Sequence, residues 1–360
     1  MKEIRLGIVG IGNCASNLIQ GLLYYKNVKS DGNIPGLMHP ILGGYKISDI
    51  KVVSAFDIDS KKVGKDVSEA IWQGSNNTVK IADVPKLDVT VLKSKTFDGI
   101  GKYMSTIVNI DNKQKSVNVA RELKDSGTEV LINFLPVGSE KATKFYAEEA
   151  IKAGCAFLNG IPEFIASNEI WSKKFESSKI PIIGDDSKSQ VGATILHRVL
   201  TKLCINRGAV IDKTYQLNFG GNTDFFTMLE RERLKSKKIS KTESVQSQMT
   251  KRLPDDKIHI GPSDFVPWLK SRKIAYIRIE GRLFGDVPFN IETRLDVEDK
   301  ANSSGVIVDS IRCLKIALDR GIGGPLISAS AYFCKHPPIQ MSDDDARKRV
   351  EMFIEGKIER

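Results

Sequence analysis

Three stretches in the second half of the chain combine charged side chains with loop or strand-end positions: GDDSKSQVGAT, NFGGNTD and RERLKSKKISK. Their polar residues are Asp185, Asp186, Lys188, Ser189, Asn218, Asn222, Asp224, Lys235, Lys237, Lys238 and Lys241. Lys237 and Lys241 are four residues apart, which places them on one face of a helix. Ammonium groups stabilise negative charge that develops on oxygen, and lysines transfer protons when burial and neighbouring cations lower their pKa. These stretches are therefore candidates for a ligand site.

Each stretch also has an ordinary structural explanation. A run of lysines is most often the solvated face of a helix. Two aspartates that follow a strand can cap the next helix, because a side-chain oxygen accepts its unpaired backbone N–H groups. His197, inside the helix expected after Asp186, is interpreted as structural. Residue types alone therefore do not show whether these stretches bind a ligand or only support the fold.

A glycine turn near the N-terminus predicts a dinucleotide site. The segment from Leu6 to Ala15 reads LGIVGIGNCA, an apolar run that enters the spacing Gly-x-Gly-x-x-Ala. Gly10 allows the tight turn, Gly12 lets the backbone approach a pyrophosphate, and Ala15 permits close packing of helix on strand. Asp57, at the end of the second strand, is expected to hold the adenosine ribose and favours NAD, because a carboxylate repels the 2′-phosphate of NADP. The motif does not name a reaction.

Apolar runs in the first half predict strands within 5–9, 51–59, 129–139, 155–162 and 180–186, with helices over 15–25 and 140–153. The Gly- and Pro-rich segment 28–45 is expected to be an inserted loop. Continuous apolar strands that alternate with helices indicate a parallel sheet covered on both faces, which is a Rossmann-type doubly wound α/β fold.

The pattern changes after residue 186. A helix is expected over 190–206, and alternating apolar and polar positions over 273–285 and 289–299 predict a mostly antiparallel sheet. A further helix is expected over 305–320, ending at Gly321. This half is therefore predicted to be an α+β unit.

Composition limits the class of protein. With 360 residues, two domains are expected, and 41% hydrophobic and 27% charged residues are ordinary for a globular protein. No apolar stretch approaches the ~20 residues of a membrane span, and the first strand begins where a signal peptide would stand, so a cytoplasmic protein without membrane insertion is expected. Five scattered cysteines without a Cys-x-x-Cys pair argue against a disulfide framework and a zinc ribbon. The net charge of +10 would help attract anionic ligands, and because no nucleic-acid motif accompanies it, a phosphorylated small molecule is at least as good a partner as a nucleic acid. The charge alone does not decide between them.

Motifs along nearly the whole chain carry a more specific signal. They are GIGNCASNLIQG, PGLMHP, GSNNT, LPVGSE, GDDSKSQVGATILHRVL, NFGGNTDF, SKKISKT, GPSDFVPWL and ASAYFCKHPP. In this order, over about residues 4–338, the chain resembles the shorter, prokaryotic type of the myo-inositol-1-phosphate synthase family. That family converts D-glucose 6-phosphate into 1L-myo-inositol 1-phosphate, the first step of inositol and phosphatidylinositol biosynthesis.

The resemblance implies a reaction without net redox change. Bound NAD oxidises C5 of the open-chain sugar, which makes the C6 protons acidic. Loss of one proton gives an enolate, C6 attacks the C1 aldehyde, and C5 is then reduced again. The cofactor is therefore catalytic and is not consumed.

The resemblance also implies the site residues. The catalytic and phosphate-binding set is Lys237, Lys241, Lys273, Lys335, Asp186, Asp224, Asp299, Ser189, Asn218 and Asn222. Lys237 is expected at the C5 oxygen, Lys273 and Lys335 at the C1 oxyanion and in proton transfer, and Lys241 at the phosphate. The NAD-binding set is Gly10, Gly12, Asn13, Cys14, Asp57, Asn76, Asn77, Asp111, Ser139 and Asp186.

A divalent cation is also expected from the resemblance. Asp186 and Asp299 are the proposed ligands of Mg²⁺ or Zn²⁺, which would act as a Lewis acid near the C1 or C5 oxygen. No set of His and Cys ligands is present for a structural zinc site, and some members of the family use a monovalent cation instead.

The same resemblance implies the domain organisation. Residues 1–190 are expected to form the NAD-binding Rossmann domain, completed by 311–360. Residues 191–310 are expected to form the catalytic and tetramerisation domain of a homotetramer. Burial of one sheet face between subunits is consistent with the alternation in AYIRIEGRLFG.

Two other functions remain as alternatives. An NAD-dependent sugar-phosphate dehydrogenase with net redox turnover normally needs one proton relay, whereas four lysines and the NFGGNTD loop favour a multi-step reaction. A non-catalytic NAD-binding protein would have no need for the intact lysine and aspartate set.

Overall fold

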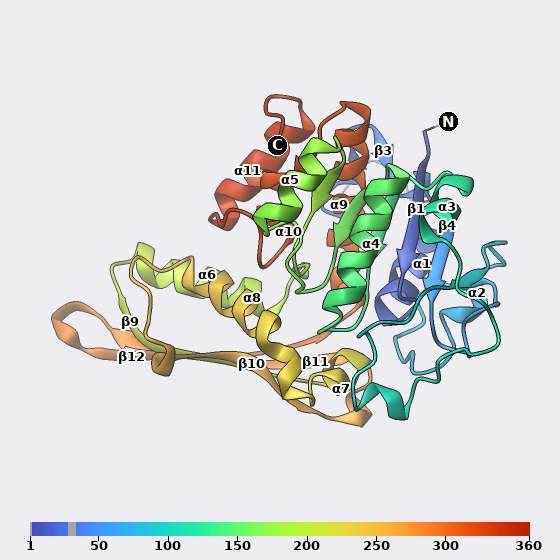
Figure 1. The fold of residues 1–360 in the computed structure, drawn as a ribbon. Coiled ribbons are helices and arrows are strands. Elements are labelled where there is room, and N and C mark those ends of the chain that lie inside the picture. Colours follow the sequence, from blue (N-terminus) through green and yellow to red (C-terminus); the bar gives the residue numbers. More distant parts are fainter. Residues whose placement is uncertain (1, 28–33) are drawn as a thin grey trace.

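A seven-stranded parallel sheet forms the larger part of the fold (Figure 1), in a computed structural model that describes residues 2–27 and 34–360. The strand order is β13-β8-β7-β6-β1-β4-β5, and every neighbouring pair in it is parallel. The strands are β1 Ile4–Val9, β4 Ile50–Asp57, β5 Val91–Lys93, β6 Val130–Asn133, β7 Ala156–Asn159, β8 Pro181–Ile183 and β13 Gly324–Pro325. The order reverses beside β1, because the chain continues to β4 on one side and to β6 on the other. Ligands bind beyond the carboxyl ends of the strands at such a point.

Helices cover both faces of this sheet, as the continuous apolar strands predict. One core includes side chains from α1 Asn13–Tyr24, α9 Ala301–Asp319, α10 Ile327–Phe333 and α11 Asp343–Ile354. A second core includes side chains from α3 Val119–Asp125, α4 Glu140–Ala153 and α5 Glu169–Ser177. The Rossmann-type doubly wound fold is thus confirmed.

A separate four-stranded sheet extends away from the parallel sheet (Figure 1), in the order β10-β9-β11-β12. Its strands are β9 Val210–Gly220, β10 Ile258–Phe265, β11 Arg272–Arg282 and β12 Pro288–Glu298. Only the pair of β9 and β10 is parallel, so the prediction of a mostly antiparallel sheet is confirmed. Over one face lie α6 Ala193–Asn206 and α8 Lys235–Gln246 (Figure 1). Short α7, Thr223–Thr227, follows β9.

The remaining elements are short. They are α2 Val67–Ala70, strands β2 Ile41–Leu42 and β3 Tyr45–Lys46, and 3-10 turns at Ile47–Asp49, Met104–Thr106, Arg231–Leu234, Asp255–Lys257, Pro267–Leu269 and Phe284–Asp286. The β2–β3 hairpin belongs to the insertion predicted over 28–45, of which 28–33 lie outside the described residues. Within 2–27 and 34–360, no helix is both long and apolar enough to cross a membrane. All five cysteines are free thiols, as their spacing predicted.

Two helices begin earlier than their sequence patterns predict. Helix α1 begins at Asn13 rather than Ala15, because Gly12 provides its N-cap and the Asn13 side chain bonds outside the helix, to Asn77. Helix α9 begins at Ala301 rather than near residue 305, because Ser303 and Ser304 direct their hydroxyls to carbonyls four residues back. Polar residues thus occupy the first turns of both helices, and both turns border the site.

Candidate functional site

A cavity of about 230 Å³ lies beyond the carboxyl ends of the parallel strands, between the two sheets. Its wall on one side is the glycine turn between β1 and α1. The opposite wall comes from the turn after β8, from α7 and α8, and from the inner ends of β11 and β12. Segments from across the chain therefore meet at the topological switch point of the sheet.

The glycine turn has the shape that a pyrophosphate requires. Gly10 has a φ of +85°, and a Cβ there would lie 2.9 Å from the carbonyl oxygen of Phe134, so a larger residue is excluded. A Cβ at Gly12 would meet no protein atom within 4 Å, and it would point into open space at the N-terminus of α1. Backbone N–H groups in the first turn of a helix lack partners within the helix and attract phosphate. The turn therefore fits a dinucleotide.

Asp57, at the end of β4, bonds to this turn through its carboxylate. Its Oδ2 accepts the backbone N–H of Ile11 at 2.8 Å, and its Oδ1 accepts those of Ile58 and Asp59. The carboxylate is partly exposed to the cavity and has free acceptor capacity, since a carboxylate has about four acceptor positions. Lys62 lies 3.9 Å from it. The position is suitable for holding ribose hydroxyls.

Three asparagines join the glycine turn to its neighbours. Asn13 and Asn77 form a reciprocal pair, in which the Asn13 Nδ2 donates at 3.0 Å and the Asn77 backbone N–H donates at 2.8 Å. Asn77 also donates to the carbonyl of Gly221 at the end of β9. Asn76 donates to the carbonyl of Ile11 and lines the cavity. Through Asn77, this group connects the glycine turn with the second sheet.

Lysine–carboxylate pairs crowd the opposite wall. Lys237 on α8 donates to both oxygens of Asp224 on α7, at 2.9 and 2.8 Å. Although burial raises the pKa of Asp224, the ammonium groups of Lys237 and Lys300 outweigh it and hold the pKa well below its usual range. Asp224 is therefore an anion that keeps Lys237 at the cavity.

A second pair comes from the turn after β8 and the segment after α10. Lys335 donates to Asp186 Oδ1 at 2.7 Å, and Ser240 on α8 donates to Asp186 Oδ2 at 2.6 Å. Burial raises the pKa of Asp186, but the nearby Lys335 and Lys237 bring it below its usual value. Asp186 therefore binds as an anion to two separate segments of the wall.

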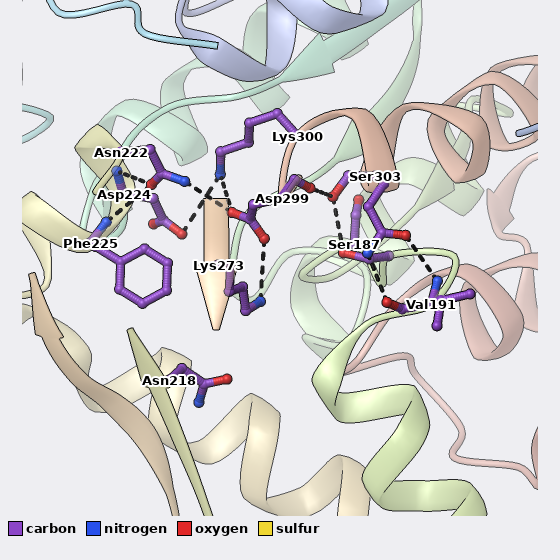
Figure 2. A network of polar contacts seen from close by, with 12 residues as sticks. Ser187, Val191, Asn218, Asn222, Asp224, Phe225, Lys273, Asp299, Lys300 and Ser303 are labelled. Carbon is purple, nitrogen blue, oxygen red and sulfur yellow. Dashed lines mark hydrogen bonds and ion pairs between the residues drawn. The ribbon is translucent and has the colours of Figure 1, made fainter. Parts of the chain in front are cut away.

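A third group surrounds Asp299 at the end of β12 (Figure 2). Its Oδ1 accepts from Lys273 at 3.3 Å, and its Oδ2 accepts from Asn222 at 3.1 Å and lies 3.0 Å from Lys300 Nζ. Burial opposes the charge on Asp299, yet Lys273, Lys300 and the Asn222 amide together hold its pKa well below the usual range. Asn222 also caps α7 by accepting from the N–H groups of Asp224 and Phe225.

Lys241 differs from these lysines. Its side chain is buried, and among residues 2–27 and 34–360 no carboxylate lies within salt-bridge distance of its Nζ. Burial lowers the pKa of Lys241 well below its usual value, and the ammonium groups of Lys237, Lys273 and Lys335 lower it further. Such an amine gives up its proton more readily than an ordinary lysine, and it can accept an anion or carry a proton.

The strand period aims Lys273 at this cluster. Side chains two residues apart share one face of a strand, so Lys273 shares a face with Ala275 and Ile277, which are buried. Arg272 points to the opposite face, where it pairs with Asp296 on β12. Lys273 is therefore directed toward the face that α8 covers.

The cavity brings together most of the predicted residues. From the two predicted sets it is lined by Gly10, Gly12, Asn13, Cys14, Asp57, Asn76, Asp186, Ser189, Asp224, Lys237, Lys241, Lys273, Asp299 and Lys335. The predicted residues that do not line it are Asn77, Asp111, Ser139, Asn218 and Asn222.

Those five residues have other contacts. Asn77 and Asn222 support residues that do line the cavity, as described above. Asn218 is buried within the second sheet, donates to the Gly261 carbonyl at 2.7 Å and lies away from Asp299 in Figure 2. Asp111 accepts from the backbone N–H groups of Lys113 and Gln114, and Ser139 donates to the carbonyl of Pro136. Asp111 and Ser139 thus have local structural contacts.

The proposed divalent-cation site does not fit the side chains present. Asp186 and Asp299 face lysine ammonium groups and amide or hydroxyl donors, which use the oxygens that a metal would need. Throughout the described part of the chain, no group of three or more His, Cys, Asp or Glu side chains is arranged to hold a metal ion. The expectation of Mg²⁺ or Zn²⁺ between Asp186 and Asp299 is therefore not supported.

Several cavity residues were not predicted. Lys300 directly follows Asp299, and its position at the end of a predicted strand was the signal that could have identified it. Lys62 approaches Asp57 and also lines the cavity. Ser303 donates to the Asp299 carbonyl (Figure 2). Its hydroxyl oxygen lies 3.0 Å from that of Ser189. Nothing in the spacing of Lys62 or Ser303 distinguishes them from surface residues.

His197 does not contribute to the cavity. It is buried between α6 and β9, with its Nε2 2.8 Å from the hydroxyl of Thr214 and its Nδ1 3.3 Å from the amide of Gln216. Burial lowers the pKa of His197 to about 4, so the ring is neutral. The structural interpretation of this residue is confirmed.

Comparison with known proteins gives a consistent result. A family model described as myo-inositol-1-phosphate synthase matches residues 192–300. The chain is 56% identical over 358 residues to the inositol-3-phosphate synthase of Mycolicibacterium smegmatis, covering 98% of each chain. It is 51% identical to the inositol-3-phosphate synthase of Corynebacterium glutamicum, again covering 98% of each. A myo-inositol-1-phosphate synthase-related protein from Thermotoga maritima shares the fold, with a TM-score of 0.80, 23% identity and 98% coverage of each chain.

Proposed function

The chain belongs to the myo-inositol-1-phosphate synthase family, and we propose that it converts D-glucose 6-phosphate into 1L-myo-inositol 1-phosphate. The observation that carries this proposal is the convergence of Lys237, Lys241, Lys273 and Lys335 on the cavity that also contains the glycine turn. A reaction through several negatively charged oxygens needs several cationic or proton-transferring groups beside the cofactor. Family membership does not favour the two alternatives, a dehydrogenase with net redox turnover and a non-catalytic NAD-binding protein.

NAD fits the cofactor side of the cavity. We propose that the open space at Gly12 and the first turn of α1 take the pyrophosphate, and that Asp57 takes the adenosine ribose. Asn13, Asn76 and Cys14 would complete that wall. When bound, NAD supplies a reversible oxidation at C5 of the sugar.

The lysines would serve the steps that follow this oxidation. Lys237, held by Asp224, would stabilise the C5 oxygen, while Lys273 and Lys335 would stabilise the C1 oxyanion and transfer protons. Removal of a C6 proton and protonation of the C1 oxygen are acid–base steps, for which amines in a buried cationic cluster are suited. Lys241 would bind the phosphate, whose negative charge would favour the protonated amine.

The test is incubation with glucose 6-phosphate and a catalytic amount of NAD. The proposal predicts inositol phosphate, measured as phosphate released by periodate, without accumulation of NADH. A steady increase in absorbance of reduced nicotinamide would overturn the proposal in favour of a dehydrogenase. NAD binding without any product would favour the non-catalytic alternative.

We propose that the enzyme is a homotetramer built on the uncovered face of the second sheet. Tyr276 on β11 is 43% exposed on the face opposite Ala275 and Ile277, and Phe284 and Val287 are exposed at the end of the β11–β12 hairpin. Burial of such apolar surface drives association. Light scattering of the purified protein measures the number of subunits, and a monomer would contradict this proposal.

A further inference from the structure

Lys300 occupies the space between two carboxylates of the site. It lies at the turn between β12 and α9, is 8% exposed, and lines the cavity. Its Nζ is 3.0 Å from Asp299 Oδ2 and 4.0 Å from Asp224 Oδ2. Figure 2 shows the side chain reaching down between the two acids. One ammonium group thus lies between two anions, Asp224 on α7 and Asp299 directly after β12.

Both of these anions hold a lysine of the proposed reaction. Asp224 binds Lys237 through both oxygens, and Asp299 binds Lys273. Asp299 is buried and Asp224 is partly exposed, and two carboxylates close to one cation would repel each other if that cation were removed. The positions of Lys237 and Lys273 therefore depend, through the two acids, on a positive charge at Lys300.

We propose that the Lys300 ammonium is an internal cation that takes the position of a bound metal or monovalent ion between Asp224 and Asp299, so that turnover requires no added cation. This inference rests on the proposed function. It makes Lys300 a positioning residue, which acts through the two acids on Lys237 and Lys273. It also explains why the oxygens of Asp299 are unsuited to a divalent cation, since ammonium groups and an amide already bind them.

The charge on Lys300 persists over the pH range of an assay. Burial alone would lower the pKa of Lys300, but the carboxylates of Asp299 and Asp224 raise it above the usual lysine value. Lys300 thus has two anions beside its ammonium group, whereas in the described part of the chain no carboxylate lies within salt-bridge distance of Lys241 Nζ.

The first test measures turnover after treatment with a chelator, in buffer whose only added cation is tetramethylammonium. We expect the wild-type rate to change less than about twofold when NH₄⁺, K⁺ or Mg²⁺ is added. Loss of an interaction worth ~1.4 kcal/mol would change the rate ~10-fold, so a twofold change means that no essential cation was missing. Lys300→Met, which keeps the length of the side chain without its charge, should be about 10- to 100-fold slower, as expected for loss of a supporting charge. Ammonium ions should restore part of the lost rate, and Lys300→Arg should retain more activity than Lys300→Met.

Lys315→Met is the matched control. Lys315 also lies between two carboxylates, at 2.9 Å from Glu129 and 2.7 Å from Asp319, but it does not line the cavity. The control variant should keep the wild-type rate and show no response to ammonium ions. A similar loss of rate in both variants would show that Lys300 has only a general structural role.

Thermal unfolding provides a readout that does not depend on turnover. Ammonium chloride should raise the Tm of Lys300→Met more than it raises that of the wild type or of Lys315→Met. The position vacated by Lys300→Met lies beside the buried Asp299, whereas Glu129 and Asp319 beside Lys315 are partly exposed to solvent. If no product forms with the wild type but this selective shift is present, the proposed reaction fails while the internal cation stands.

Three further results would overturn the internal cation. The first is a wild-type enzyme that needs an added cation for turnover. The second is a Lys300→Met enzyme that is as fast as the wild type without an added cation. The third is a Lys300→Met enzyme whose rate and Tm do not change when ammonium ions are added. If Lys300→Met does not fold, Lys300→Gln is measured in the same way, and the wild-type comparison remains decisive by itself.

Discussion

Lys335 Nζ lies 2.7 Å from Asp186 Oδ1, although the two residues are 149 positions apart in the chain. Backbone bonds support this pair, since the N–H of Lys335 donates to the Asp186 carbonyl and that of His336 donates to the Asp185 carbonyl. The other carboxylate oxygen accepts from Ser240, one residue before Lys241. One anion thus draws the C-terminal segment and α8 together and brings Lys335 near Lys241.

Lys241→Met should stabilise the protein and abolish turnover. Replacing a buried charge with an apolar side chain of similar size is expected to raise the free energy of unfolding by about 1–4 kcal/mol. The unfolded chain binds a proton at Lys241 that the folded protein releases, so wild-type stability rises with pH between the lowered pKa and about 10.4. The gain of the variant should therefore be largest at low pH and shrink as pH rises, which denaturant unfolding at several pH values measures.

Lys238→Met is the control for this prediction. Lys238 lies on the same helix, α8, but is exposed to solvent. It should change neither stability by more than about 0.5 kcal/mol nor turnover. A Lys241→Met protein that is less stable than the wild type at acidic pH would contradict the lowered pKa.

Lys273→Ala should remove turnover and leave NAD binding intact. The side chain contacts Asp299 among the lysine–carboxylate pairs, whereas Gly10 and Gly12 of the glycine turn come from a different segment of the cavity lining. Loss of a group that stabilises an oxyanion is expected to lower kcat by about 10²- to 10³-fold. Phosphate release measures turnover, and nicotinamide fluorescence measures binding of reduced cofactor.

Arg272→Ala tests whether the loss of turnover is specific to the face of β11 that carries Lys273. Arg272 is adjacent in sequence but points outward to Asp296, in an exposed pair of small energetic value. It should keep nearly full activity. Loss of cofactor binding in Lys273→Ala would argue against the role in turnover proposed for this lysine.

Gly12→Val should weaken NAD binding by at least about tenfold, which corresponds to ~1.4 kcal/mol, while the fold is retained. Gly12 has a φ of −94°, which other residues adopt, and its Cβ would meet no protein atom within 4 Å. The added side chain would instead occupy the space for the pyrophosphate. Calorimetric titration with NAD and thermal unfolding measure the two effects.

Gly21→Ala is the matched control for the glycine turn. Gly21 lies on the same helix, α1, also has open space around a Cβ, and does not line the cavity. This change should leave the affinity for NAD unaltered. Equal affinities of Gly12→Val and wild type would contradict the position assigned to the cofactor.

Local pattern was sufficient for much of the fold. The apolar strands, the helix over 140–153 and the glycine turn appear where the sequence predicts them, because side-chain period and turn chemistry act over a few neighbouring residues. The β2–β3 hairpin within the predicted insertion was not foreseen, since two-residue strands have no measurable period.

The candidate site also has a part that the sequence predicts and a part that it does not. Residue type and order in the sequence determined which lysines and aspartates are candidates, and the family resemblance grouped them. The tertiary structure decided their partners: Asp186 with Lys335, Asp224 with Lys237, and Lys300 between two acids. These pairings depend on how β12, α7, α8 and the segment after α10 pack around one cavity. Long-range packing sets such distances, and the charges that it brings together set the pKa values, so neither can be obtained from the order of residues alone.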